Sequence, residues 1–383
     1  MPRWWKPKSW SPKNSGVPLN RLAFQLLSQL THEQPTGNVF FSFFSILLCL
    51  LMVWDGASGE TREEITRLLA LSEEDPEWRA GPWARLKSVM SIRDPNLELA
   101  IANSLWCADH VQIQQHFVAQ VAEKYGAEVV PLSFQNAGAI DRINSWAAEK
   151  TKGKINELIS TLDPLTLLMA LNAVYFKGAW KEPFRKDETK MEPFYSARGG
   201  TVQVPMMHQY DAYPYHEEKS FQEVRLSYGE GRVGMYVFLP SKGLSLAEFL
   251  QAATPADWQR RLRWLPEKEG NLALPRLKLE HRIELAPILP KLGMRKAFGD
   301  SAQFDHIAHP PPPILLNAVM HQAVVDVNEK GTEAAAVTGA VMPMAAARKR
   351  PKPFTMIVDR PFLFLIHDNP SGMSLFVGVV NNL

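Results

Sequence analysis

The sequence has few of the features that assign a chain to a simple functional class. Its 383 residues include only two cysteines, which are too few for a disulfide scaffold. We expect Cys49, in an apolar helix, and Cys107, at the end of a strand, to be free thiols. The formal net charge of +2 leaves almost no excess of basic residues to attract a nucleic acid. The composition therefore argues against a disulfide-stapled protein and gives no support for a nucleic-acid partner.

A membrane span and an export signal are also missing. The apolar run from Val39 to Trp54 is shorter than the ~20 residues that a span needs, and Ser42 and Ser45 interrupt it. We expect a buried helix there and no membrane partner. Residues 1–17 form a tail rich in Trp, Lys and Pro that lacks the apolar stretch of a signal peptide. Two compartments fit this tail: the extracellular space for a mature secreted form, and otherwise the cytoplasm.

Catalytic motifs are absent as well. The run Gly229–Gly234 has the glycine pattern of a dinucleotide loop, but two strand-like runs flank it, which predicts a hairpin. His306 and His309 have a helical spacing without a third metal ligand nearby. A nucleophile elbow is not found. We therefore expect no catalytic residues, no metal site and no cofactor, in a protein that is not an enzyme.

What the chain does have is apolar content and regular periodicity. Hydrophobic residues make up 46% of the chain, enough for a sizeable core, and no linker or repeat divides residues 18–383, which we expect to be a single domain. The pattern predicts helices at 18–31, 43–54, 59–70, 114–125 and 137–151. It predicts strands at 97–106, 167–178, 202–210, 221–228, 233–239, 269–279, 315–328, 361–367 and 374–380. Helices crowd the N-terminal half and strands the C-terminal half, which indicates an α+β fold with mainly antiparallel sheets. Residues 310–313 are all proline and should form an extended connector.

The stretch from Val327 to Ala340 is the most informative part of the sequence. A strand-like alternation runs up to it, stops at Gly331, and gives way to small residues. If 332–340 formed a strand, one face would carry only small uncharged residues and Glu333 would lie on the other face. The alternative is an ordinary helix start or linker, because Glu, Ala and Lys also favour helices. Periodicity alone leaves both interpretations open.

A family resemblance favours the first interpretation. Residues Glu329–Ala336 resemble the reactive-loop hinge of the serpins. Other segments are similar to the same family in the same order: Asn38–Ile46, Asp55–Thr61, Asn172–Trp180, Pro183–Phe184, Leu274–Leu277, Leu292–Met294, Ala297–Phe298, Arg360–Phe364 and Leu375–Gly378. The resemblance implies a serpin fold with three mainly antiparallel β-sheets, about eight or nine helices and an exposed reactive loop near residues 329–353.

The resemblance also implies a mechanism and a partner. A serine protease would cut the loop and be trapped as a covalent complex while the loop inserts into the main sheet as an extra strand. We expect the inhibitor itself to be a monomer. The hinge residues carried over from the family are Glu329, Gly331, Thr332, Glu333, Ala334, Ala335, Ala336 and Thr338.

The reactive bond is placed by the family's spacing from the hinge glutamate. Counting from Glu329 gives the bond between Ala345 and Ala346, with Met344 as the neighbouring candidate. These residues suit the shallow pocket of an elastase-like or subtilisin-like protease. The rival is Arg348, which would suit a trypsin-like pocket. The basic cluster around Arg348 also has two plainer explanations, namely solvation of the loop and contact with an acidic protease surface.

A second set of residues is expected to control opening of the main sheet. Ser42, Ser45, Asn172 and His321 match the family's polar cluster beneath the opening point, and Trp180 matches the position where insertion begins. We call the four polar residues the sheet-opening cluster. On residue type alone they could simply be hydrogen-bonded core groups, and Trp180 could be core packing. The family usually has proline after the first serine, whereas Phe43 stands here, which puts the helix entrance in question.

A second functional class shares this fold. A non-inhibitory serpin would act as a binding or carrier protein or as a chaperone. Such relatives tend to carry bulky, charged or proline residues in the hinge, whereas this chain has alanine at 334–336 and Thr338. The hinge therefore favours the inhibitor.

Overall fold

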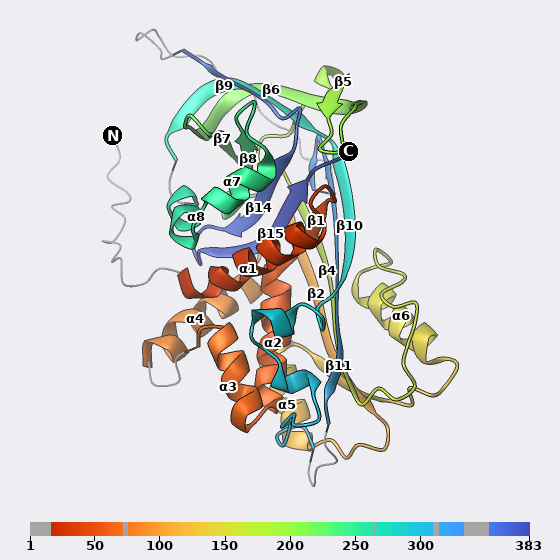
Figure 1. Cartoon of the computed structure of the whole chain (residues 1–383). Helices are drawn as coiled ribbons and strands as arrows, with labels where there is room; N and C mark the ends of the chain where they lie inside the picture. Colours follow the sequence, from red (N-terminus) through yellow and green to blue (C-terminus); the bar gives the residue numbers. More distant parts are fainter. Residues whose placement is uncertain (1–16, 72–75, 263–264, 309–313, 333–351) are drawn as a thin grey trace.

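The computed structural model describes residues 17–71, 76–262, 265–308, 314–332 and 352–383. Most of the N-terminal tail, the proline run 310–313 and most of the predicted reactive loop lie outside these residues. The described chain has helices gathered at one end and beside the sheets, and long strands running through the other end (Figure 1). Both cysteines are buried and unpaired, as predicted.

The helices surround one fully buried central helix. Their bounds are α1 Val17–Glu33, α2 Phe43–Gly56, α3 Gly59–Leu68, α4 Pro76–Met90, α5 Gln115–Tyr125, α6 Ala139–Lys150, α7 Leu246–Ala252 and α8 Pro255–Arg261. Every residue of α2 is buried, which confirms the predicted core helix. It packs against α3, α5 and the sheets, while α6 lies on the opposite side of the main sheet (Figure 1). Among the described helices, none is long and apolar enough to cross a membrane.

The main sheet has the strand order β10-β11-β12-β4-β2-β3. The bounds are β2 Leu97–Ala108, β3 Glu128–Leu132, β4 Leu168–Ala179, β10 Leu277–Glu284, β11 Leu316–Asn328 and β12 Gly331–Thr332. Strands β11 and β4 pair in parallel from Leu316 with Leu168 to Val324 with Tyr175. The β2–β3 pair is also parallel, and the remaining pairs of this sheet are antiparallel.

Two further sheets share one long strand. The strand order is β1-β15-β14-β8-β7-β6 in one part and continues through β6 to β9 and β13, with β5 also paired to β6. Their bounds are β1 Val39–Phe41, β5 Lys190–Tyr195, β6 Thr201–Glu217, β7 Phe221–Ser227, β8 Val233–Pro240, β9 Glu267–Pro275, β13 Phe354–Ile357, β14 Phe362–Asp368 and β15 Met373–Val380. Strands β7 and β8 pair antiparallel around Gly229–Gly234, so the predicted hairpin is confirmed. The three-sheet α+β architecture is therefore the predicted one.

Two sequence predictions need correction. The strand expected at 269–279 is two strands, because the chain leaves β9 at Pro275 and enters β10 at Leu277 in a different sheet. Helices α4, α7 and α8 were not predicted from the residue pattern, although the family resemblance implies a helix near residues 77–93. The apolar residues of α4 are spread around its axis, so it lacks an apolar stripe. Helices α7 and α8 span seven residues each, yet both begin with a capping box, which is a signal that the sequence does carry.

Candidate functional site

The hinge enters the main sheet at its upper end, which is the C-terminal end of β4. Strand β12, which is Gly331–Thr332, pairs with β11 on one side and with β4 on the other. Lower in the sheet, β11 and β4 pair with each other directly. Backbone hydrogen bonds hold the turn before β12: the Trp180 amide donates to the Lys330 carbonyl and the Phe184 amide to the Glu329 carbonyl, each at 2.9 Å. Gly331 and Thr332, which begin the segment of small residues, therefore already lie between β11 and β4.

Gly331 is required by this geometry. Its φ of +136° lies in a region that residues with a side chain rarely adopt. A Cβ atom at this position would lie 2.1 Å from the Gly178 carbonyl oxygen and 2.7 Å from the Trp180 nitrogen. Both are backbone atoms, of β4 and of the residue directly after it, and cannot turn aside as a side chain could. The hinge can approach β4 this closely only with glycine.

Thr332 is buried next to a polar partner. Its side chain is fully buried, and its hydroxyl lies 2.7 Å from the Tyr228 hydroxyl. The Tyr228 ring stacks on Trp180 with 4.3 Å between ring centroids, and burial raises the pKa of Tyr228 well above its usual range. The Trp180 indole donates a hydrogen bond to the Asn328 carbonyl at 2.9 Å. Trp180 thus contacts the hinge directly, and Tyr228 is a partner that the sequence interpretation missed.

Glu329 anchors the start of the hinge. Its carboxylate accepts hydrogen bonds from the Arg276 guanidinium and, at 2.6 Å, from the Thr189 hydroxyl. Burial alone would raise the pKa of Glu329, but the hydrogen bonds from Arg276 and Thr189 outweigh it and hold the pKa below its ordinary value. Arg276 lies between β9 and β10, so the anchor ties the hinge to the point where the chain passes from one sheet to another.

The sheet-opening cluster connects α2 with three strands of the main sheet. The Ser42 amide donates to Nε2 of His321 at 3.0 Å, so the other ring nitrogen carries the proton and donates to the Asn172 side-chain oxygen. The Asn172 amide group donates to Ser45 and to Asn103. His321, Asn172 and Asn103 lie opposite one another on β11, β4 and β2. The four predicted residues are therefore brought together, with Asn103 as a fifth member that the sequence interpretation missed.

His321 is neutral in this environment. Its ring is fully buried, and burial lowers its pKa to about 3, with the neighbouring His281 adding a smaller effect in the same direction. Only a neutral ring can accept the hydrogen bond from the Ser42 amide while donating to Asn172. Protonation of His321 would therefore break the bond to α2.

The phenylalanine after Ser42 leaves the helix entrance intact. Helix α2 begins at Phe43 with Ser42 as its N-cap, and the Ser42 hydroxyl accepts from the Ser45 amide at 3.3 Å. The same hydroxyl donates to the Leu375 carbonyl at 2.8 Å. Phe43 itself is fully buried. The entrance thus uses a serine cap and a buried ring where the family usually has a proline.

Several predicted site residues cannot be placed. The hinge residues Glu333, Ala334, Ala335, Ala336 and Thr338 lie outside the described residues, as do Met344, Ala345, Ala346, Arg348 and His309. Within the described ranges, no group of three or more His, Cys, Asp or Glu side chains could hold a metal ion.

Comparisons with known proteins match nearly the whole chain. A family profile described as "Serpin (serine protease inhibitor)" matches residues 18–383. An uncharacterized serpin-like protein of Thermococcus kodakarensis is 35% identical over 366 residues, which are 95% of this chain and 84% of that protein. The leukocyte elastase inhibitor of Bos taurus is 34% identical over 370 residues, which are 94% of this chain and 96% of the inhibitor. The solved structure of human thyroxine-binding globulin with thyroxine matches with a TM-score of 0.86 at 29% identity, over 97% of this chain and 98% of that one.

Proposed function

The chain belongs to the serpin family, and from this premise we propose that it inhibits a serine protease by inserting its cleaved reactive loop into the main sheet. The observation that carries the proposal is strand β12, because Gly331 and Thr332 already lie between β11 and β4. The chain is the trapped substrate in this mechanism and supplies no catalytic group of its own.

The chemical steps belong to the protease. Its serine oxygen attacks the carbonyl carbon of Ala345, the bond to the nitrogen of Ala346 breaks, and the histidine of the protease gives the leaving amine its proton. The acyl-enzyme that results is tethered to the hinge. Insertion then has to finish before water attacks the ester. A covalent complex with the protease is therefore the expected product, formed by one copy of this chain.

The hinge geometry supports insertion below β12. Thr332 is fully buried and hydrogen-bonded, so the first inward position accepts a small polar side chain. The next inward positions, Ala334, Ala336 and Thr338, are also small and uncharged. To continue, the new strand must separate His321 on β11 from Asn172 on β4. We propose that the sheet-opening cluster holds these strands together until cleavage frees the loop, because a hydrogen-bonded network of this kind keeps one arrangement until several bonds break together.

The proposed target is an elastase-like or subtilisin-like protease. The bait Ala345, or its neighbour Met344, would fit a shallow apolar pocket. The name of the bovine relative, leukocyte elastase inhibitor, agrees with this class. Arg348 and a trypsin-like protease remain the rival pair for the reactive bond.

A denaturing gel tests the proposal. The protein is mixed separately with elastase, subtilisin and trypsin, and each mixture is boiled and run beside the unreacted components. We expect a band at the summed mass with elastase or subtilisin, and the mass of the released fragment identifies the bond. A complex with trypsin and cleavage after Arg348 would move the bait to the rival site. Cleavage of the loop without any complex would support the non-inhibitory alternative, a binding or carrier protein. One structural neighbour of this chain, thyroxine-binding globulin, was solved in complex with thyroxine.

A further inference from the structure

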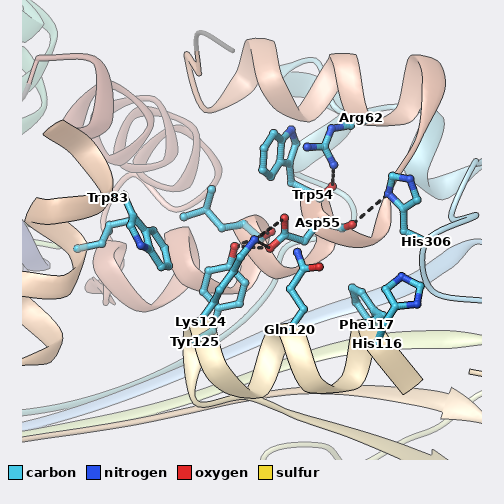
Figure 2. Close-up of a pocket in the computed structure, with 12 residues that line it drawn as sticks. Trp54, Asp55, Arg62, Trp83, His116, Phe117, Gln120, Lys124, Tyr125 and His306 are labelled. Carbon is cyan, nitrogen blue, oxygen red and sulfur yellow. Dashed lines mark hydrogen bonds and ion pairs between the residues drawn. The ribbon is translucent and has the colours of Figure 1, made fainter. Parts of the chain in front are cut away.

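A cavity of 560 Å³ lies among α2, α3, α4 and α5 (Figure 2), which gather at the end of the molecule opposite β5, β6 and β9 (Figure 1). Its walls come from the C-terminal end of α2, from α3, α4 and α5, and from the segment that carries His306. Pockets for small molecules in proteins are typically about 300–1,000 Å³. The proposed inhibition uses none of these residues.

The body of the cavity is aromatic. Trp54 from α2, Trp83 from α4 and Phe117 from α5 line it. Trp83 packs edge-on against Tyr125 with 5.7 Å between ring centroids, and the Arg62 guanidinium lies 3.6 Å from the centre of the Trp54 ring. These rings offer flat apolar walls to a planar ligand.

The charge of the lining is positive. Among the described residues that line the cavity, Asp55 is the only acidic one, and its carboxylate already accepts hydrogen bonds from Lys124 at 3.0 and 3.3 Å and from the Tyr125 hydroxyl at 2.7 Å. Two permanently cationic side chains, Arg62 and Lys124, stand against this one carboxylate. A cation would therefore be disfavoured in this cavity and an anion favoured.

One end of the cavity offers hydrogen-bond donors that have no protein partner. Figure 2 shows Trp83 at one end, His116 and His306 at the other, and the Gln120 amide between them, pointing from α5 toward the end of α2. The His306 ring donates to the Asp55 carbonyl at 3.2 Å. Among the described residues, neither the Gln120 amide nor the His116 ring makes a hydrogen bond. Both stand on α5, and His116 lies in its first turn, where the helix dipole also favours a negative charge.

We propose that this cavity binds a small aromatic anion, such as an aryl carboxylate or sulfonate. The ring system lies between Trp54, Trp83 and Phe117. The negative group faces Gln120 and His116. The aromatic walls supply most of the affinity, and the donors on α5 select the anion over a neutral molecule of the same shape.

The first test uses a fluorescent aromatic sulfonate, anilinonaphthalene sulfonate, titrated into the intact folded protein. We expect saturable binding of one molecule per chain with a blue-shifted emission. Phenylnaphthylamine has the same rings without the sulfonate, and we expect it to bind at least about tenfold more weakly, a difference of about 1.4 kcal/mol. Equal binding of the two probes, or no saturable binding of the sulfonate, would overturn the proposal.

The second test locates the probe with matched variants. Gln120→Trp places a large ring in the cavity and should weaken sulfonate binding at least about tenfold, because the ring occupies the volume that the probe needs. Ala119→Trp adds the same ring at an exposed position of α5 and should change the affinity less than about twofold.

A second pair of variants changes the charge instead of the volume. His116→Glu places a negative charge at the end of the cavity where the sulfonate should lie, and His110→Glu makes the same change on an exposed turn outside it. We expect only the first to weaken binding. If Gln120→Trp and His116→Glu both bind the sulfonate as tightly as the unmodified protein, the probe is elsewhere and the cavity is not its site.

Discussion

His321 is one of two fully buried histidines, with His367, whose lowered pKa should make the stability of this fold depend on pH. Burial lowers the pKa of His321 to about 3, whereas an unfolded histidine titrates near pH 6.5. The unfolded chain therefore binds a proton below that pH while the native chain does not. The stabilisation is complete above about pH 6.5 and is lost progressively as the pH falls toward 3, by about 1.4 kcal/mol per pH unit.

The corresponding prediction compares His321→Gln with the unmodified protein. Glutamine can still accept from the Ser42 amide and donate to Asn172, but it does not titrate. Between pH 6.5 and 4.5, we expect the unmodified protein to lose about 2–3 kcal/mol more unfolding free energy than the variant. Urea unfolding followed by tryptophan fluorescence measures this. His110→Gln, at an exposed position, should leave the pH slope unchanged. A variant at 321 with the unmodified slope would show that another group carries the effect.

Gly331 gives a second prediction at the residue scale. Gly331→Ala combines an unfavourable φ with a contact of 2.1 Å to the Gly178 carbonyl, so β12 should leave the sheet and expose Trp180. Gly199→Ala is the matched control, because its φ is +83° and nothing lies within 4 Å of the added atom. We expect the control to lose about 1–3 kcal/mol from backbone strain alone and Gly331→Ala to lose clearly more, with a red shift of tryptophan emission. Equal losses would argue that β12 does not need this close approach.

At the scale of elements, β12 is the part of the fold that the sequence could describe only in part. The alternation before Gly331 and the small residues after it predicted a segment able to become a strand. That the first two residues already lie between β11 and β4 depends on Tyr228, Arg276 and Thr189, which are remote in sequence. A local sequence pattern cannot predict contacts with residues so distant along the chain.

The same contrast appears in other elements. Helix α2 was predictable because its apolar run has a helical length and a serine cap. The passage from β9 to β10 was not, because both strands have the same local pattern and only their pairing partners differ. Asn103 escaped prediction for a similar reason, since its place opposite Asn172 depends on strand register.

Insertion through β12 leads to a prediction about Thr332. Thr332→Arg would place a charge at a fully buried position between two strands, where the threonine hydroxyl now pairs with the Tyr228 hydroxyl. Burying this charge costs several kcal/mol, so insertion should become slower than hydrolysis of the acyl-enzyme. We expect the number of inhibitor molecules consumed per trapped protease to rise at least about tenfold. Thr332→Ser, which keeps the hydroxyl, should inhibit normally. Unchanged trapping by Thr332→Arg would contradict the role assigned to the small inward face.

At the scale of the whole molecule, β12 separates β11 from β4 at one end of the main sheet, and the two strands pair directly with each other along Leu316–Val324 and Leu168–Tyr175. A protease that forms no acyl-enzyme, such as a metalloprotease, can cut the loop without being trapped. We expect the cut chain to insert its loop and to unfold at least about 10 °C higher, because several kcal/mol of new ladder bonding and burial shift the midpoint by about 2 °C per kcal/mol. Scanning calorimetry of intact and cut protein measures the shift. The unfolding temperature of the Thr332→Arg variant should rise less after cleavage. If cleavage does not raise the unfolding temperature of the unmodified chain, insertion is contradicted.

The anchor of Glu329 on Arg276 and Thr189 has a consequence for how such a loop can change. It fixes one end of the loop to the frame of the molecule, so a residue added or removed beyond position 332 alters the distance to the bait without disturbing the anchored end. Under the proposed mechanism, the bait sequence and its distance from the hinge can therefore be changed while Glu329–Thr332 stays in place. A designer seeking a new protease specificity would therefore graft onto residues beyond the hinge and leave the Glu329–Thr332 segment untouched.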